Sequence, residues 1–301
     1  MNKKIELDVI ILNYNTSFLL EKCLISIFEK KWQYQINVVV VDNGSVDNSL
    51  KMVKSKFPEV KIFANKENLG FSSGNNVALK NSNAKYCLLL NSDTKISENS
   101  LDQLVDFMEE TNFAIASCKL FYPDGSFQPN TGDLPLGISL FSWISGVDDL
   151  FRILGIDFPS YHRNLRSYYK DKLDVGWVSG TAMMIKRDVL DKVGYLDDKI
   201  FMYGEDVEIC FRARKKGFKV GWTNKAEIVH IGGGSFKNPQ FSQWLGEFKG
   251  LLYLYKKNYG FLANVFLRIS LYLLIPLRIV VFLLLGKLQY SLTYAKLLPQ
   301  I

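Results

Sequence analysis

Short apolar runs alternate with segments of helical periodicity from residue 7 to residue 96. The runs at 7–15 (LDVIILNYN) and 36–45 (INVVVVDNGS) are rich in Val and Ile and end in polar residues, as buried strands do. The pattern recurs at 60–70 and 84–96, with a helical segment at 71–82. This alternation predicts an α/β domain with a mostly parallel central sheet flanked by helices.

Polar side chains collect where these predicted strands end. They are Asn13 and Asn15 after the first strand, Asp42 and Asn43 after the second, Asn68 after the third and Asp93 after the fourth. In open sheets of this kind, ligands bind beyond the carboxyl ends of the strands. The sequence therefore predicts a binding site at this edge of the sheet.

The turn after the first strand, NYNTS (13–17), has no G-x-G-x-x-G pattern, and no G-x-x-x-x-G-K-[ST] occurs in the sequence. The sequence therefore lacks the main motifs that would indicate a dinucleotide-dependent oxidoreductase or a P-loop protein. A nucleotide would instead be held by side chains and a metal ion. The carboxylate of Asp42 is suited to accept hydrogen bonds from a base or a ribose. Alternatively, residues 42–45 form only a turn and a helix cap.

The segment LLLNSDT (88–94) delivers the carboxylate of Asp93 to the sheet edge. Oxygen ligands there favour Mg²⁺ or Mn²⁺ bridging a diphosphate. A second ligand is available in His230, which ends another strand-like run, AEIVH, ahead of a glycine loop. Imidazole suits Mn²⁺ better than Mg²⁺. A purely structural histidine is the alternative from the residues alone.

The stretch FMYGEDVEICFRARKKG (201–217) places Glu205 and Asp206 behind a glycine, at the start of a predicted helix. Consecutive side chains point in different directions, so one carboxylate can face a pocket while the other caps the helix N-terminus. One such carboxylate suffices as a general base. From spacing alone, the better interpretation is that both are ordinary helix-start carboxylates.

Seven motifs occur in the order seen in glycosyltransferase family 2: VIILNYN, VVVVDNGSVDNS, ENLGFSSGNN, LLLNSDT, YPDGSFQ, WVSGTAMMIKRDVLDKVGYLDDKIFMYGEDVEICFRARKKG and AEIVHIGGGS. The chain resembles that family over residues 7–236, and most resembles its rhamnosyltransferase-like bacterial members. The resemblance implies a GT-A fold, a nucleotide-diphosphate sugar donor, Mg²⁺ or Mn²⁺ as cofactor, and inversion at the anomeric carbon.

The resemblance also assigns roles to residues. By motif, Asp42 matches the nucleotide-contacting aspartate, Asp93 the last aspartate of the DxD metal motif, and Asp206 the general base of the ED motif, with Glu205 in support. His230 matches a histidine that contacts the metal or the diphosphate. The implied nucleotide-sugar contacts are Asn13, Asn15, Asp42, Asn43, Asn68, Gly70, Asn75, Asn91 and Ser92. The chain departs from the family pattern at Asn91, where many members have aspartate, so only one carboxylate remains for the cation.

The second half of the predicted domain is assigned to the acceptor. We expect a GT-A domain at 1–236, with a nucleotide-sugar-binding half at 1–95 and an acceptor-binding half at 96–236. Acceptor contacts are predicted at Trp177, Gly180 and Glu205, although Trp177 fits a core position equally well. Residues 123–172 are rich in turn formers and predict a long loop with short helices over the acceptor side. Arg212 is a candidate for the diphosphate or an ordinary solvated helix residue.

The C-terminal region, 237–301, differs in charge from the rest of the chain. It contains eight Lys or Arg and one acidic residue, against 29 of each sign in residues 1–236. Its segment 261–286 is apolar except for a few positions, of which Asn264, Arg268 and Tyr272 share one helical face. A membrane-associating helical region on an anionic surface is expected, lying in the plane. A spanning or re-entrant helix, and a soluble bundle or oligomer helix, remain alternatives.

Together these features predict a transferase at the cytoplasmic face of the cell membrane, peripheral or anchored by its C-terminal region. The expected reaction moves rhamnose from dTDP-rhamnose to a lipid-linked saccharide in cell-surface polysaccharide synthesis. Alternatives are a UDP-hexose or UDP-N-acetylhexosamine donor, or a GT-A scaffold with weak catalysis. Unpaired cysteine spacing and the lack of a cleavable-signal pattern fit a reduced compartment. No nucleic-acid partner is expected, and the oligomeric state is open.

Overall fold

The computed structural model describes residues 3–232 and 239–301. The chain divides into two compact units, Met1–Thr131 with Tyr169–Ser235, and Gly132–Tyr168 with Phe236–Ile301. This differs from a linear division after residue 236, a boundary that itself lies outside the described residues. The segment 132–168 belongs with the C-terminal region because its helices pack there, as the contact between Trp143 and Phe248 illustrates.

The first half of unit 1 has the predicted alternation of strands and helices. Strands β1 (Lys3–Asn13), β2 (Tyr34–Asp42), β3 (Lys61–Ala64) and β4 (Tyr86–Asn91) lie parallel in the order β3-β2-β1-β4. Helices α1 (Ser17–Phe28), α2 (Ser49–Lys56) and α3 (Gly70–Lys80) connect them. The carboxyl ends of β1, β2 and β4 therefore meet at one edge, as expected from the sequence.

The second half of unit 1 continues the same sheet with mixed pairing. Strand β11 (Ala182–Lys186) is antiparallel to both β4 and β6 (Phe113–Phe121), and β12 (Lys219–His230) runs parallel to β6. Antiparallel pairs add β5 (Thr94–Ile96) and β9 (Lys172–Asp174) to β12, and β7 (Phe127–Gln128) to β6. The remaining elements are α4 (Ser100–Glu110), β8 (Thr131–Gly132), β10 (Trp177–Val178), α7 (Arg187–Val193) and α8 (Glu205–Lys215).

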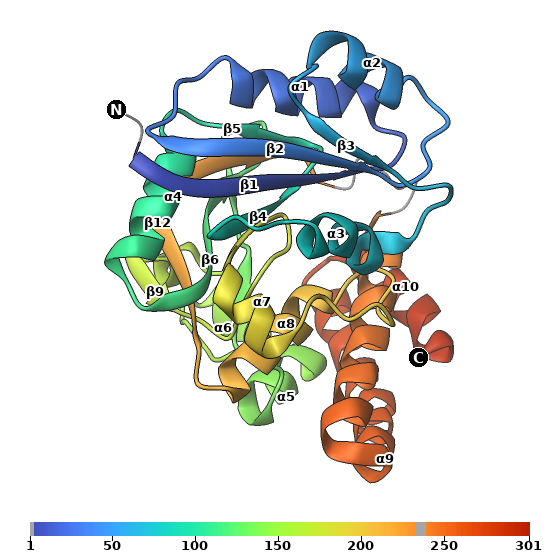
Figure 1. Ribbon diagram of the computed structural model, residues 1–301. Coiled ribbons are helices and arrows are strands. Elements are labelled where there is room, and N and C mark those ends of the chain that lie inside the picture. Colours follow the sequence, from blue (N-terminus) through green and yellow to red (C-terminus); the bar gives the residue numbers. More distant parts are fainter. Residues whose placement is uncertain (1–2, 233–238) are drawn as a thin grey trace. The chain divides into compact units, whose positions relative to one another are not determined.

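Alternation along the strands separates two core layers. Leu7, Val9 and Ile11 of β1 are fully buried in one cluster with residues of α1, α2 and α4, as the period of two in a strand requires. Figure 1 shows α1 and α2 on one face of β1 and β2, and α3 on the other. Helices on both faces leave the edge at the strand ends as the place for a site.

Unit 2 is helical. It contains α5 (Gly137–Ser145), α6 (Val147–Ile153), η1 (Arg166–Tyr168), α9 (Pro239–Leu284), α10 (Leu288–Leu297) and η2 (Leu298–Gln300). The long α9 is broken at Gly260, whose φ of 87° is not helical, so residues 261–284 form a second helix that includes Pro276. The short helices expected within 123–172 are present as α5 and α6.

The helix at 261–284 exposes one apolar face. Leu262, Leu273 and Leu284 are 81%, 68% and 78% exposed, and their spacing of eleven residues places them in line. Residues Leu267, Leu271 and Ile275 are buried. Among the described residues, Phe241–Leu284 is the one helix long and apolar enough to cross a membrane. Asn264 is buried and its amide donates to the Leu252 carbonyl at 2.6 Å, so it does not join a polar outer face.

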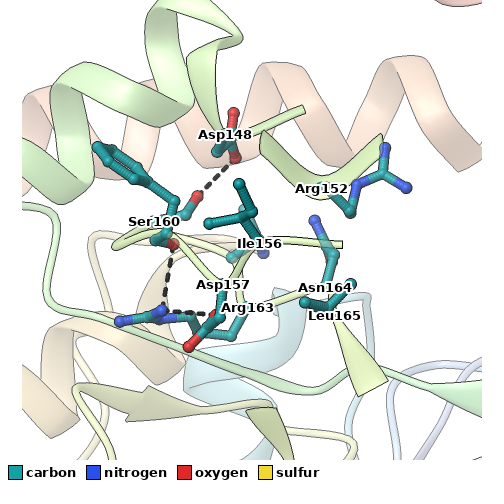
Figure 2. Close-up of a pocket in the computed structure, with 10 residues that line it drawn as sticks. Asp148, Arg152, Ile156, Asp157, Ser160, Arg163, Asn164 and Leu165 are labelled. Carbon is teal, nitrogen blue, oxygen red and sulfur yellow. Dashed lines mark hydrogen bonds and ion pairs between the residues drawn. The ribbon is translucent and has the colours of Figure 1, made fainter. Parts of the chain in front are cut away.

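A small cavity lies within unit 2, lined by residues from α6 to Leu165 (Figure 2). Its charged groups are already paired: Ser160 donates to Asp148 at 2.6 Å, and Arg163 lies 2.8 Å from both Asp157 and Asp133. The volume of about 20 Å³ suits about one water molecule. We therefore assign this cavity to the internal packing of unit 2.

Candidate active site

Asp93 and His230 meet at the edge of the sheet in unit 1. Asp93 lies in the turn between β4 and β5, and β5 pairs with β12 so that Thr94 faces His230. The Nε2 atom of His230 lies 3.2 Å from Asp93 Oδ1 and 3.3 Å from Asn91 Nδ2. Residues 137 positions apart in the sequence thus bring an oxygen and a nitrogen within 3.2 Å of each other, and their binding of a metal stays a prediction.

Asp93 is held in its ionised form. Burial alone would raise its pKa, but the hydrogen bond from His230, the charge of that ring and backbone N–H groups outweigh burial, so the pKa lies below its ordinary value. The Gly232 N–H donates to Asp93 Oδ2 at 3.2 Å, and the Ile231 N–H donates to the Asp93 carbonyl at 3.1 Å. The carboxylate is 9% exposed, so it is fixed and negative at neutral pH.

Asp93 and His230 fit a divalent cation whose remaining coordination positions are filled by a bound ligand and water. Within residues 3–232 and 239–301, no group of three or more His, Cys, Asp or Glu side chains is placed to hold a metal. Mg²⁺ and Mn²⁺ sites of nucleotide-dependent enzymes commonly use one or two protein donors and take the rest from phosphates and water. Asp93 and His230 supply two such donors. Asn91 directs its amide toward His230 rather than offering a second charge.

The predicted general base lies on the neighbouring part of the sheet edge. Asp206 is the second residue of α8, which begins after Gly204 with a φ of 99°. Its Oδ2 accepts from the Gly180 N–H at 3.1 Å, and the next residue, Thr181, accepts from the Asn91 N–H at 3.0 Å. The loop 179–181 therefore joins Asp206 to Asn91. Glu205 is 4% exposed beside it.

The predicted donor-binding residues after β1 and β2 form one hydrogen-bonded network. Asn13 Nδ2 donates to Asp42 Oδ1 at 3.0 Å, and Thr16 bonds both Asn13 Oδ1, at 2.7 Å, and Ser92 Oγ, at 2.9 Å. The network thus runs from Asp42 to the residue beside Asp93. Asp42 is only 1% exposed. Asn15, whose φ is 53°, stabilises the same loop, because its Oδ1 accepts a hydrogen bond from the Val46 N–H at 2.8 Å.

Other predicted donor contacts are used within the protein. Asn43 donates to the Gly70 carbonyl at 2.9 Å and to Asn68 Oδ1 at 3.2 Å, and Asn75 Nδ2 donates to the Phe71 carbonyl at 3.0 Å. Gly70 has a φ of +80°, and a Cβ there would lie 2.4 Å from the Phe201 carbonyl oxygen. These residues position the chain around the site, and a direct contact with a ligand stays a prediction for each.

Two further candidate residues, Trp177 and Arg212, are used within the protein in packing and internal hydrogen bonds. Trp177 is 5% exposed, which corresponds to the core alternative. Arg212 is saturated by Glu208 and by the carbonyls of Val193 and Tyr195, so its guanidinium fixes the loop before α8 and not a diphosphate. These carbonyl partners lie 17 and 19 residues before Arg212 in the sequence, so charge patterning along the helix could not predict them.

Sequence reasoning missed three residues. Thr16 joins the network described above, and Asn76 pairs through both amide atoms with the backbone of Leu196, at 2.8 and 3.1 Å. Gln128 Oε1 lies 3.0 Å from His230 Nδ1. The only signal for Gln128 was its place at the end of the YPDGSFQ motif, because its partner is 102 residues away.

Residues 8–194 match the model of the family described as glycosyl transferase family 2. The chain belongs to this family, as the seven motifs predicted. The N-acetylglucosaminyl-diphospho-decaprenol L-rhamnosyltransferase of Mycobacterium tuberculosis is 27% identical over 243 residues, or 74% of this chain and 75% of that protein. The low-salt glycan biosynthesis hexosyltransferase of Haloferax volcanii is 29% identical over 198 residues, or 64% of this chain and 58% of its own length.

Solved structures establish the fold. The mannosyltransferase PcManGT from Pyrobaculum calidifontis, in complex with GDP-Man and Mn²⁺, has a TM-score of 0.60 at 16% identity, over 98% of this chain and 79% of its own. TarS of S. aureus has a TM-score of 0.56 at 17% identity, over 83% of this chain and 39% of its own. The predicted GT-A fold is thereby confirmed. The chain is a glycosyltransferase by family, and its fold is GT-A.

Proposed function

We propose that this chain is an inverting, metal-dependent transferase that moves rhamnose from dTDP-rhamnose to a lipid-linked saccharide in cell-surface polysaccharide synthesis. The observation that carries the proposal is the 3.2 Å approach of Asp93 to His230, joined through Asn91 and residues 180–181 to Asp206. The choice of sugar and acceptor is supported by the mycobacterial relative, which is named as an N-acetylglucosaminyl-diphospho-decaprenol L-rhamnosyltransferase. Residues 1–95 would form the donor half and residues 96–236 the acceptor half.

Asp206 takes the proton in this proposal. As the acceptor oxygen attacks the anomeric carbon from the side opposite the diphosphate, its hydroxyl proton passes to a carboxylate oxygen of Asp206. The hydrogen bond from the Gly180 N–H fixes that carboxylate at the site edge. Inversion follows because a single displacement occurs, with the bond to the diphosphate oxygen breaking as the new glycosidic bond forms.

Asp93 and His230 would hold Mg²⁺ or Mn²⁺, which neutralises charge on the leaving diphosphate. The lowered pKa of Asp93 keeps its oxygens available as anionic ligands at neutral pH. Asp42 and the network through Asn13 and Thr16 would orient the nucleoside.

Unit 2 would bind the surface of an anionic membrane at the cytoplasmic face. Its helix at 261–284 packs one face internally and exposes the other, which supports an in-plane position over a spanning one. Lys256, Lys257 and Lys287 flank the apolar segment, and cations near anionic headgroups are favoured by about 1 kcal/mol each.

Transfer and donor hydrolysis measured with dTDP-rhamnose, UDP-glucose, UDP-galactose and UDP-N-acetylglucosamine, with Mn²⁺ and with EDTA, test the donor and the metal. We expect turnover with dTDP-rhamnose that EDTA abolishes. Preference for a UDP sugar would show that the donor is a UDP-hexose or a UDP-N-acetylhexosamine and not dTDP-rhamnose. Absence of turnover with every donor, despite nucleotide binding, would favour a scaffold.

The Asp206→Asn variant tests the base. The amide keeps the shape but cannot take a proton, so kcat should fall by about 10²- to 10⁴-fold while the Kd for the donor is retained. Unchanged kcat would remove Asp206 from the reaction.

Membrane binding is tested by a triple variant, Leu262→Glu, Leu273→Glu and Leu284→Glu. Burying each leucine is worth about 1.5–3 kcal/mol, so partition into phosphatidylglycerol vesicles should fall by at least about 100-fold. Phe18→Glu, at a position 66% exposed in unit 1, serves as the control. Equal sedimentation of the triple variant and the wild type would contradict this surface.

A further inference from the structure

Gln128 contacts the ring nitrogen of His230 that faces away from Asp93. Its Oε1 atom lies 3.0 Å from Nδ1, while Nε2 on the opposite side of the ring lies 3.2 Å from Asp93 Oδ1. Gly232 lies next to both side chains, since a Cβ at this position would be 3.6 Å from Gln128 Nε2 and 3.7 Å from His230 Cε1. The ring is thus held between a side-chain amide and the site.

Local sequence explains how Gln128 reaches this position. Residues 122–126 form a tight turn, in which the Gly125 N–H donates to the Tyr122 carbonyl at 2.9 Å and Asp124 accepts from the Ser126 N–H at 2.9 Å. The Pro-Asp-Gly sequence favours such a turn. The turn sets the register of β7 on β6, with Gln128 opposite Leu120.

The sheet then brings Gln128 and His230 to the same face. Leu120 is paired with Gln128 on one side and with Ile228 on the other. Paired residues share a face, and His230 shares the face of Ile228 because it lies two residues further along β12. Two long side chains that start two strands apart can therefore meet.

The chemistry of this contact selects one form of the ring. A neutral imidazole carries one N–H donor and one lone pair. The amide oxygen of Gln128 can only accept, so Nδ1 must be the donor. Without a cation, Nε2 lies 3.2 Å from Asp93 Oδ1, to which a protonated ring donates, and 3.3 Å from the Asn91 amide nitrogen. A cation held by Asp93 would take the place of the Nε2 proton, and the remaining ring proton would stay on Nδ1, against Gln128. Metal-bound histidines commonly donate their second N–H to a carbonyl in this way.

We propose that Gln128 is a positioning residue that keeps the imidazole proton of His230 on Nδ1 and thereby presents Nε2 as the ligand atom. This inference rests on the proposed function of His230 as a metal ligand. It extends the site to the β6–β7 hairpin, so the YPDGSFQ motif gains a defined role in metal binding.

The first test is the tautomer itself. The chain has two histidines, so ¹⁵N-histidine labelling gives two imidazoles, and the His162→Gln variant identifies the signals of His230. In protein loaded with Mg²⁺ and dTDP, long-range ¹H–¹⁵N spectra should show a protonated Nδ1 and an unprotonated Nε2. The Gln128→Leu variant should lose this fixed pattern, and Gln128→Glu, which keeps an acceptor, should retain it.

The second test is metal affinity, measured as free Mn²⁺ by electron paramagnetic resonance in the presence of dTDP. Loss of an outer hydrogen-bond partner typically costs about 10- to 100-fold in affinity, and we expect this loss in Gln128→Leu. Gln128→Asn keeps the amide but is one methylene shorter, so its affinity for Mn²⁺ should also be lower than that of wild type. Gln128→Glu should bind Mn²⁺ within a few-fold of wild type.

The outcomes separate the two proposals. Gln128→Leu and Gln128→Asn with wild-type affinity for Mn²⁺ would overturn the role of Gln128 alone. A proton on Nε2 of His230 in wild-type protein loaded with Mg²⁺ and dTDP would overturn both the role of Gln128 and the role of His230 as a ligand through that atom. Wild-type protein that binds no Mn²⁺ with dTDP present would overturn the metal site and the role of Gln128 with it.

Discussion

Asp93 in unit 1 and Asp148 in unit 2 are carboxylates of nearly equal burial, 9% and 8% exposed, whose pKa values move in opposite directions. Burial acts to raise the pKa of both. At Asp93 the hydrogen bond from His230, the charge of that ring and backbone N–H groups outweigh burial and lower the pKa. At Asp148 burial dominates and the pKa is raised, because the attraction of Arg278 is opposed by neighbouring Asp149.

The difference lies in where the compensating charge is bound. Arg278 is 6% exposed and donates to Asp149 at 2.9 Å, not to Asp148. Its guanidinium also lies over the rings of Trp143, Phe282 and Tyr294. Among the described residues of unit 2, Arg278 is the one buried cation, and it is used for packing within the helices. Unit 1 keeps a carboxylate ionised at an edge where a ligand can use it.

The largest effect is expected from Arg278→Leu. Removing Arg278 breaks its buried ion pair with Asp149, which keeps Arg152 as a partner at 2.7 Å, and takes the attraction of that cation away from Asp148. Breaking a buried ion pair destabilises a protein by about 3–5 kcal/mol, which urea denaturation measures. Arg166→Leu, at an exposed position of unit 2, should change stability by less than about 0.5 kcal/mol. Equal stability of Arg278→Leu and wild type would mean that the buried charge is not needed in unit 2.

Asp93→Asn should act on the metal and not on folding. Loss of the anionic ligand is expected to weaken Mn²⁺ binding in the presence of dTDP by at least about 100-fold, or about 2.7 kcal/mol. The melting temperature without metal should shift by only a few degrees. If the variant bound Mn²⁺ as wild type does, Asp93 would be a structural carboxylate like Asp148.

The smallest effect is a pair of opposite pH dependences. Asp93 has a folded pKa below its ordinary 3.8, so its contribution to stability is present above that value and is lost as the pH falls through the folded pKa. Asp148 has a folded pKa above 3.8, so stability present below 3.8 is lost as the pH rises through the folded pKa.

Melting temperatures of Asp93→Asn and Asp148→Asn between pH 3 and pH 7 measure these signs. At pH 7, Asp93→Asn should melt below wild type and Asp148→Asn above it, and both differences should shrink toward pH 3. If the melting temperatures of the two variants differed from wild type in the same direction at pH 7, the opposite pKa shifts of Asp93 and Asp148 would be contradicted.

Much of the site was predictable because it lies at strand ends. Local periodicity places Asp42 at the end of β2 and Asp93 after β4, and parallel strands bring their carboxyl ends to one edge. His230 and Asp206 were candidates from the residues themselves, and the resemblance assigned their roles. The bonds that hold the site were not predictable: Thr16 reaches Ser92, and Gln128 reaches His230, across 76 and 102 residues.

The division into units was also beyond the sequence. The segment 132–168 has weak periodicity, and nothing in it indicates that Asp149 will meet Arg278, 129 residues later. Burial of Trp177 likewise depended on what packs over β10, and a tryptophan suits a sugar site or a core equally well.

By itself, the sequence determined the order of strands and helices, the apolar basic C-terminal region and the chemical types at the sheet edge, because these follow from periodicity and composition along the chain. Only the tertiary structure decided which polar groups are used up internally and which face the site. That outcome depends on strand register and on hydrogen bonds between distant residues, and no local pattern encodes either.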